Sequence, residues 1–292
     1  MGISLALLTA FFVSLRSSFE KFALKEIDEI TVGLGFRFFA FLFLAIFIAI
    51  FGIEVQYDAT NLMLPLLIGG SLNVLSTIFM LKALKKGDLS LVGPLAALTP
   101  LFILLTSPFI IGQFPSRIGF FGVILSVVGA ICLNYKNHNL KDSLMNSINK
   151  KNGSFYALMA ALSWSVSSSI DKIGVTYSNP FVWSLLINLY VVIALVVYLS
   201  FKDIEKVNIF KNEFTVKHLI ISGLFAALAS VTQNYAYGFI LVVYVISIKR
   251  LSSVFEVFIG HFILKENHFK QRLLGSLIMV IGSILILFSN GG

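Results

Sequence analysis

The chain has 292 residues, of which 58% are hydrophobic and only 12% are charged, and its formal net charge is +8. An ordinary soluble domain has about 25% charged residues, so the composition excludes a soluble globular protein, a disordered chain and a disulfide scaffold. The single cysteine, Cys132, can form no intrachain disulfide. A basic balance is typical of nucleic-acid binding or of cytoplasmic loops in a membrane protein. A chain this apolar has no solvated surface for a duplex, which leaves the lipid bilayer as its surroundings.

Ten apolar runs follow one another along the chain, mostly with short loops between them. A spanning helix needs about 20 apolar residues, and the runs are continuous instead of alternating as in a barrel, so we expect α-helices. The first run has no charged leader or cleavage site and is expected to be retained. The predicted spans are about 3–22, 31–53, 62–84, 89–112, 117–135, 154–175, 180–201, 217–238, 240–264 and 272–290.

The two halves of the chain repeat each other. Residues 14–21 and 165–172 both read Ser-x-x-Ser-Ser-apolar-acid-Lys, with a shift of 151 positions. Glycines recur near the other end of each unit, with a shift of 153: Gly122 and Gly129, then Gly275 and Gly282. We expect a first five-span repeat over 1–135, a polar linker over 136–153 and a second repeat over 154–292. Because five is odd, the second copy has the opposite orientation in the membrane. The predicted fold class is therefore an all-α integral membrane protein of ten transmembrane helices, built as two inverted five-helix repeats.

Lysine and arginine are concentrated in the loops after spans 1, 3, 5, 7 and 9. The positive-inside rule places that side in the cytoplasm and both termini outside. The residues on that side are Lys21, Lys25, Lys82, Lys85, Lys86, Lys136, Lys141, Lys150, Lys151, Lys202, Lys206, Lys211, Lys217, Lys265, Lys270 and Arg272.

The most distinctive local sequence runs from Arg250 through Glu266 to the glycine-spaced tenth span. This arrangement resembles the EamA family of the drug/metabolite transporter superfamily, over nearly the whole chain. The resemblance implies a ten-span carrier of two inverted five-span units, with Glu266 at the position of the family's loop Glu. The first half carries Gln113 there. Family members typically have a proline in the ninth span near the position of Ser253, and this chain lacks it there. The equivalent position in the first half has the proline, Pro100. The resemblance also implies cytoplasmic termini, which is opposite to the result of the charge rule.

Small hydroxyl residues form one stripe on the first span and an equivalent stripe on the sixth. They are candidates for two polar walls of a central cavity, and the alternative is serine-mediated helix packing with the terminal lysines reaching to the interface. Arg16 lies deeper and has Glu20 one turn later as a potential partner. Arg37, near the start of the second span, is expected at the interface.

The ninth span contains charged residues at predicted membrane depth, where each charge needs a reason. In a continuous helix, Lys249, Ser253 and Glu256 share a face and are suited to a polar substrate or a proton site; Arg250 is adjacent. Two amides of the eighth span and one aromatic ring of the sixth are further candidates. The predicted substrate-binding residues are Ser14, Arg16, Ser17, Trp164, Ser165, Ser168, Gln233, Asn234, Lys249, Arg250, Ser253 and Glu256.

No zinc, nucleotide-binding or cysteine-pair motif is present, so we expect no cofactor, no metal site and no catalytic residues.

The inverted repeat favours a secondary transporter that moves a small polar metabolite by alternating access. We expect an exporter or exchanger driven by an ion or substrate gradient, with a proton as a candidate coupling ion. Cations outnumber unpaired acids among the candidates, which indicates an amino acid, an organic anion or a related compound. The alternatives are a membrane enzyme acting on a lipid-linked substrate, with Glu26, Asp28 and Glu29 as its one acidic cluster, and a channel. We expect a monomer or homodimer in the plasma (inner) membrane of a prokaryote.

Overall fold

The computed structural model describes residues 1–86, 95–134, 153–201, 213–262 and 269–289, and within these ranges the regular elements are all α-helices. The predicted polar linker over 136–153 lies almost entirely outside the described residues. The helices are α1 (Gly2–Ala23), α2 (Glu29–Ile50), α3 (Ala59–Lys86), α5 (Thr99–Ile111), α6 (Arg117–Asn134), α8 (Gly153–Thr176), α9 (Pro180–Ser200), α10 (Glu213–Ala236), α11 (Val242–Lys249), α12 (Ser252–Phe262) and α13 (Phe269–Ser289).

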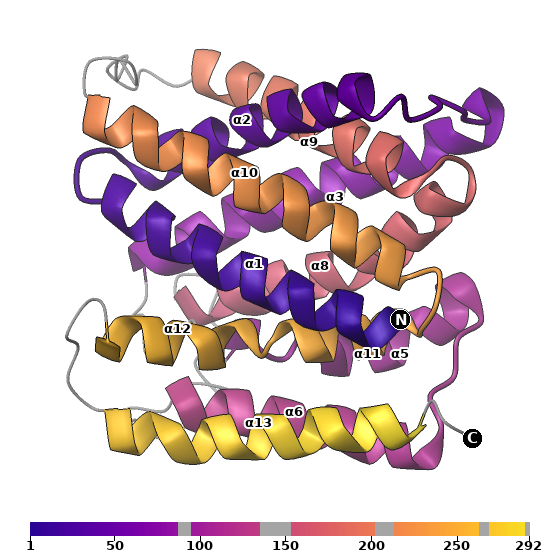
Figure 1. The fold of residues 1–292 in the computed structure, drawn as a ribbon, viewed down its shortest axis with the longest axis vertical. Helices are drawn as coiled ribbons and strands as arrows, with labels where there is room; N and C mark the ends of the chain where they lie inside the picture. Colours follow the sequence, from indigo (N-terminus) through magenta and orange to yellow (C-terminus); the bar gives the residue numbers. More distant parts are fainter. Residues whose placement is uncertain (87–94, 135–152, 202–212, 263–268, 290–292) are drawn as a thin grey trace.

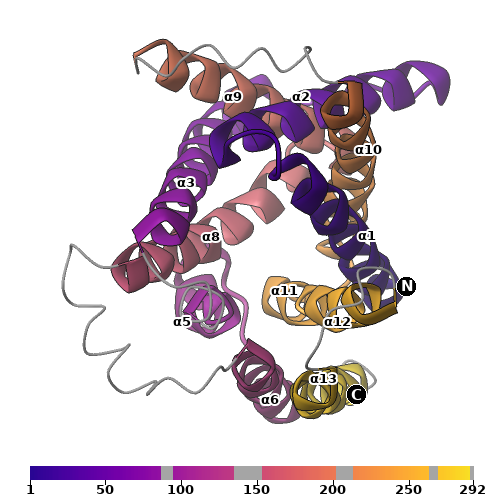
Figure 2. The same cartoon turned by 90° about the vertical axis from the view of Figure 1, so that its left-hand side faces the viewer.

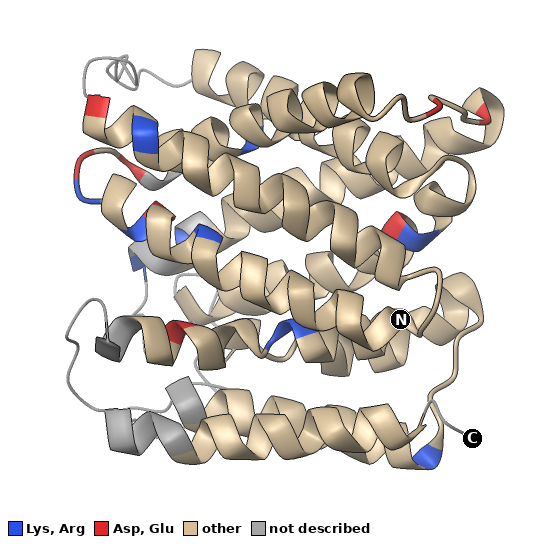
Figure 3. Ribbon diagram, viewed as in Figure 1, with Lys and Arg blue, Asp and Glu red and all other residues tan. Residues whose placement is uncertain are grey.

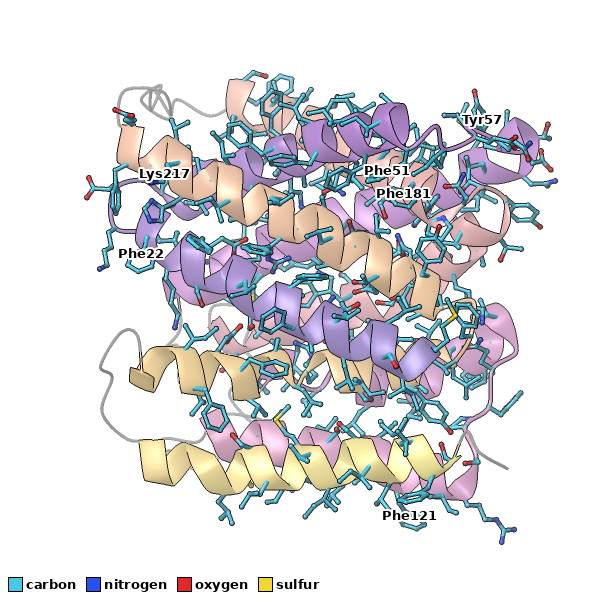
Figure 4. All side chains as sticks on the ribbon, viewed as in Figure 1. Phe22, Phe51, Tyr57, Phe121, Phe181 and Lys217 are labelled. Carbon is cyan, nitrogen blue, oxygen red and sulfur yellow. The ribbon has the colours of Figure 1, made fainter. Side chains whose placement is uncertain are left out.

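Every predicted span contains described helix, and the predicted fold class is confirmed. Within the described residues, five helical segments are long and apolar enough to cross a membrane: Gly2–Ala23, Ile30–Ile50, Ala59–Met80, Pro180–Ser200 and Glu213–Ala236. The shorter apolar helices are Thr99–Ile111, Arg117–Cys132 and Leu274–Ser289. Large apolar side chains such as Phe51 and Phe121 are exposed on the outside of the bundle (Figure 4), as expected where the solvent is lipid.

Equivalent helices of the two repeats begin in the same way. Asp28 caps α2 by accepting hydrogen bonds from the backbone nitrogens of Ile30 and Thr31, at 3.0 and 3.1 Å. Asn179, 151 positions later, caps α9 in the same manner. A side-chain oxygen at this position satisfies amide groups that the first helical turn leaves unpaired. The repeat seen in the sequence therefore extends to the local structure.

The repeats pack together by exchanging partners (Figures 1 and 2). Helix α1 lies against α10, and α8, its counterpart, lies against α3, the counterpart of α10. Helix α2 also packs against its own counterpart α9, and α6 packs against its counterpart α13. A Cβ on Gly70 would lie 2.5 Å from the Tyr190 ring, and a Cβ on the equivalent Gly223 would lie 2.4 Å from Phe39. The pseudo-two-fold axis that relates the repeats therefore also relates two contacts in which a glycine lies close to an aromatic residue.

The two ends of the bundle differ in charge. Figure 3 shows Lys and Arg gathered at the end where α1 passes into α2, which we call the basic end and define by Lys21, Lys25, Lys82, Lys86 and Lys217. Figure 4 labels Lys217 and Phe22 there, and Tyr57 at the opposite end. Helix α1 starts and α13 finishes at the opposite end (Figure 1). The start of α1 and the end of α13 therefore lie at one end of the bundle, across from the basic end.

The fourth and ninth spans are interrupted at equivalent positions. Residues 97–98 form a turn before α5, and residues 250–251 separate α11 from α12. At the second break, Arg250 and Leu251 donate their backbone N–H to the carbonyls three residues earlier, Ser247 and Ile248, at 3.2 and 2.9 Å. These tighter bonds replace the α-helical pattern. The expectation of one continuous ninth helix over 240–264 is therefore wrong, and with it the single face assigned to residues 249, 253 and 256.

The α6–α13 contact depends on glycine. A Cβ on Gly129 would lie 2.6 Å from the backbone nitrogen of Met279 and 2.8 Å from the carbonyl of Gly275. We expect Gly129→Ala to destabilise the protein by about 1–3 kcal/mol, since backbone cannot move aside as a flexible side chain can. Thermal unfolding of the purified protein in detergent measures this. Gly33→Ala is the control, because a Cβ at Gly33 meets nothing within 4 Å; equal melting temperatures for the two variants would contradict the packing described.

Asp58, just before α3, gives the fold a pH-dependent helix cap. Its carboxylate accepts hydrogen bonds from the Thr60 and Asn61 backbone and the Asn61 side chain, and these bonds lower the pKa of Asp58. The cap is therefore complete above the ordinary aspartate pKa of about 3.9 and is lost as the pH falls through the lowered folded-state pKa.

We expect acid to speed hydrogen exchange in the first turn of α3 in the wild type, after correction for the intrinsic rate. Asp58→Asn keeps a cap and is expected to lack the extra acid dependence. If the two proteins show the same acid dependence, the carboxylate is not responsible.

Candidate functional site: a cation-rich central cavity

A cavity of about 420 Å³ lies between the two repeats. A deeper recess of about 120 Å³ shares much of its lining. The wider part extends to Leu24, Val32 and Gly33, beside the connection from α1 to α2, so the cavity leads toward the basic end. Its size lies within the usual range for small-molecule sites. The polar and charged lining residues are Arg16, Glu20, Arg37, Asn73, Thr77, Thr99, Trp164, Ser167, Ser168, Asp171, Trp183, Ser184, Asn188, Ser230, Gln233, Asn234, Lys249, Arg250 and Ser252.

Two arginines of the cavity lining lie close to the ring of one phenylalanine. The guanidinium carbons of Arg16 and Arg37 lie 5.2 and 5.6 Å from the centre of the Phe36 ring. Arg16 also pairs with Glu20, with 3.1 Å between Nε and Oε1. Arg37 donates to Oδ1 of Asn188 at 3.4 Å. The aromatic face stabilises the two cations while their donor groups remain directed to polar partners.

Arg37 and Asn188 are counterparts in the two repeats, since 151 positions separate them. Their contact therefore lies on the pseudo-two-fold axis. Asn188 donates its amide to the Ser184 carbonyl at 2.8 Å, and Asn234 donates to Oγ of Ser184, also at 2.8 Å. The first bond, within α9, orients the Asn188 side chain that accepts from Arg37, and the second joins α9 to α10.

The break in the ninth span places two more cations at the cavity. Lys249 donates to Oε1 of Gln233 at 2.7 Å, and Gln233 donates in turn to Oη of Tyr237 at 2.8 Å. Arg250 donates from Nη2 to the carbonyl of Ala96 at 3.1 Å. Ala96 lies just before the break in the fourth span, so Arg250 joins the two interrupted spans. The Nε atom of Arg250 is buried and has no hydrogen-bond partner among the described residues.

The second acidic group of the lining is Asp171, near the end of α8. Its Oδ1 accepts a hydrogen bond from Nε1 of the buried Trp183 at 3.1 Å. Asp171 also interacts electrostatically with Lys249 and Arg37. A Cβ on Gly174 would lie 2.3 Å from the Trp183 ring, so this glycine allows the indole to reach the carboxylate.

Seven of the twelve residues predicted to bind substrate line the cavity: Arg16, Trp164, Ser168, Gln233, Asn234, Lys249 and Arg250. Ser14 and Ser165 are buried and donate to the carbonyls of Phe11 and Leu162 within their own helices. Ser17, Ser253 and Glu256 are also outside the lining. Glu256 interacts with Ser17 and Lys21 on α1, the helix against which α12 packs.

Several functional candidates were missed by sequence reasoning. Arg37 was expected at the membrane interface, and the structure places it in the cavity instead. Asp171 and Asn188 were not selected. The repeat contained the missing signal: Asp171 occupies the position of Glu20 in the second copy, and Asn188 occupies that of Arg37. Within the described residues, no group of three or more His, Cys, Asp or Glu side chains is placed to hold a metal ion.

Comparison with known proteins agrees with this architecture. The sequence matches the EamA-like transporter family over residues 1–135 and 151–288. No curated protein matches the chain. A solved crystal structure of another protein resembles it with a TM-score of 0.75 and 15% identity, over 98% of this chain and 95% of the other, which shows a shared fold. Members of the family are integral membrane transporters of small molecules, not enzymes. With both repeats covered by the family match, this chain belongs to the EamA-like transporter family.

Proposed function

We propose that this protein is a secondary transporter that carries a small polar metabolite with an anionic group, by alternating access, through the central cavity. The observation that supports it is the position of Arg37, Lys249 and Arg250 in the lining of a cavity between two inverted repeats. Cations buried at membrane depth are costly and favour an anionic partner. An inverted repeat provides two mirrored conformations around one central site, and the driving gradient is that of an ion, such as a proton, or of a second substrate.

The end opposite the basic end is closed by contacts between the repeats. Gln113 Oε1 accepts the backbone N–H of Val242 at 3.0 Å, and Oη of Tyr244 accepts the backbone N–H of Ser116 at 3.0 Å. Helix α1 packs its first turns against residues that follow α10, where a Cβ on Gly2 would lie 2.8 Å from a side-chain carbon of Phe239.

The outer loops of the two repeats add further contacts at this closed end. The Asp58 backbone donates to the Tyr177 carbonyl, and the Asn179 side chain donates to the Glu54 carbonyl, both at 2.9 Å. The structure therefore has one open and one closed end, as one state of an alternating-access cycle would. In the mirrored state, these contacts would separate and the basic end would close.

The lysine distribution supports a cytoplasmic basic end, with both termini on the other side of the membrane. We expect Tyr57→Cys, in a Cys132→Ser background, to react with a membrane-impermeant maleimide added to intact cells. Lys217→Cys is expected to react only after the cells are permeabilised. Reversed labelling of these two exposed positions would mean that the termini are cytoplasmic.

Access to the cavity can be measured in the same background. Thr77 lines the wider part of the cavity, so we expect Thr77→Cys to react from the same side as Lys217→Cys. Adding Tyr244→Phe removes the acceptor for the Ser116 N–H and is expected to increase reaction from the Tyr57 side severalfold. If Thr77→Cys reacts equally from both sides before that change, the contacts at the end opposite the basic end do not close the cavity, and the assignment of one open and one closed end is contradicted.

Substrate binding can be found by a thermal-stability screen of the purified protein over metabolite classes. A ligand at a concentration of 100 times its Kd adds about 2.7 kcal/mol of stability, which corresponds to several degrees in melting temperature. We expect anionic metabolites to give this shift and Arg37→Gln to abolish it. Arg117→Gln, an exposed arginine outside the cavity, is the matched control. A shift of equal size in both variants would show that the ligand binds elsewhere.

A further inference from the structure

The cavity lining has a formal excess of positive charge. Four lining side chains are cationic, Arg16, Arg37, Lys249 and Arg250, and two are acidic, Glu20 and Asp171. Among the described lining residues, two positive charges are thus left without a counter-charge. Buried charge is retained in proteins when it is paired or when a ligand pairs it.

The excess is concentrated on three of the four cations. Arg16 is neutralised by Glu20 at 3.1 Å. Among the described residues, the hydrogen-bond acceptors of Arg37, Lys249 and Arg250 are uncharged, namely the Asn188 side chain, the Gln233 side chain and the Ala96 carbonyl.

The nearby acids do not remove this excess. Asp171 interacts with Arg37 and Lys249, so it supplies one negative charge for three cations. Glu256 also affects Arg250 electrostatically. It lies outside the lining, however, and its largest charge interaction is with Lys21, a cation that is also outside the lining. Glu256 and Lys21 together carry no net charge, so including them leaves the excess of two positive charges unchanged.

The three cations are arranged along the cavity. Arg37 and Lys249 line both the recess and the wider part, whereas Arg250 lines only the wider part. The first repeat has Ala96 and Ala97 where the second has Lys249 and Arg250, so the cationic wall is on one side of the pseudo-two-fold axis. A compact ligand with charge at two points would fit this distribution better than one with a single charge.

We propose that the substrate is a compact dianion, a short dicarboxylate or a phosphomonoester, with one charged end between Arg37 and Lys249 and the other at the unpartnered Nε of Arg250. This inference rests on the proposed transport function and specifies its substrate class. A dianion would cancel the excess charge of the lining. A monoanion would leave one positive charge uncompensated, and a zwitterion would leave both.

The test is uptake of labelled probes into liposomes containing the full-length protein at pH 7.4. Succinate is the dicarboxylate and glycerol 3-phosphate the phosphomonoester; butyrate is a monoanion with the same number of carbons as succinate, and alanine is a zwitterion. We expect saturable uptake of at least one dianion at a rate at least tenfold above those of butyrate and alanine. Cross-competition between the two dianions identifies which of them the cavity prefers.

Charge variants connect the preference to the cavity. Lys249→Gln is expected to lower the ratio of dianion to butyrate uptake at least tenfold, Lys249→Arg to retain it, and Lys217→Gln at the exposed basic end to leave it unchanged. Melting temperatures establish that each variant is folded, and Arg37→Gln replaces Lys249→Gln if the latter is unstable.

Each result bears on the proposal. Faster saturable uptake of butyrate or alanine than of both dianions, or a preference that survives both Lys249→Gln and Arg37→Gln, would overturn the dianion assignment and leave the transport function standing. No saturable uptake of any probe, together with no ligand-induced thermal shift in the wider screen, would count against both.

Discussion

Positive charge at membrane depth is the constraint on which the rest of this structure depends. A lysine or arginine at the centre of a spanning helix costs about 2.5–3.5 kcal/mol even on the mildest scales, and this cavity is lined by four of them. The surrounding helices supply what such groups need: the Phe36 ring close to two arginines, amides on α9 and α10, and a carbonyl at a broken helix. The two helix breaks are part of the same solution, because they provide backbone acceptors inside the bundle.

The inverted repeat determines where these groups meet. Equivalent residues come together on the pseudo-two-fold axis, as Arg37 and Asn188 do, so a change in only one copy produces an asymmetric pair at the centre. The copies have also diverged at the helix breaks, where alanines in the first correspond to cations in the second. A framework with near-symmetric packing thus surrounds a site whose charge is concentrated on one side. The framework suits two mirrored conformations, and the charge selects the ligand.

The spans, the repeat and the family resemblance were predictable from the sequence because each depends on local composition or on a periodic pattern. The Arg16–Glu20 pair was predictable for the same reason, being one helical turn apart. The position of Arg37 was not predictable, because the membrane depth of a residue near the end of a span depends on how far α2 extends past its neighbouring helices. The break beside Arg250 was also missed, since its own sequence has no proline. Glu256 was grouped with Lys249 only under the assumption of an unbroken helix.

If Arg37, Lys249 and Arg250 hold the transported anion, a labelled dianion must bind between them. Anomalous X-ray diffraction from crystals soaked in bromosuccinate, a dicarboxylate with a heavy-atom label, locates such a ligand. We predict a bromine peak inside the central cavity, between these three side chains, and its loss in crystals of Arg37→Gln. A bromine peak that lies only outside the cavity, or one in the cavity that persists with equal strength in Arg37→Gln, would contradict it.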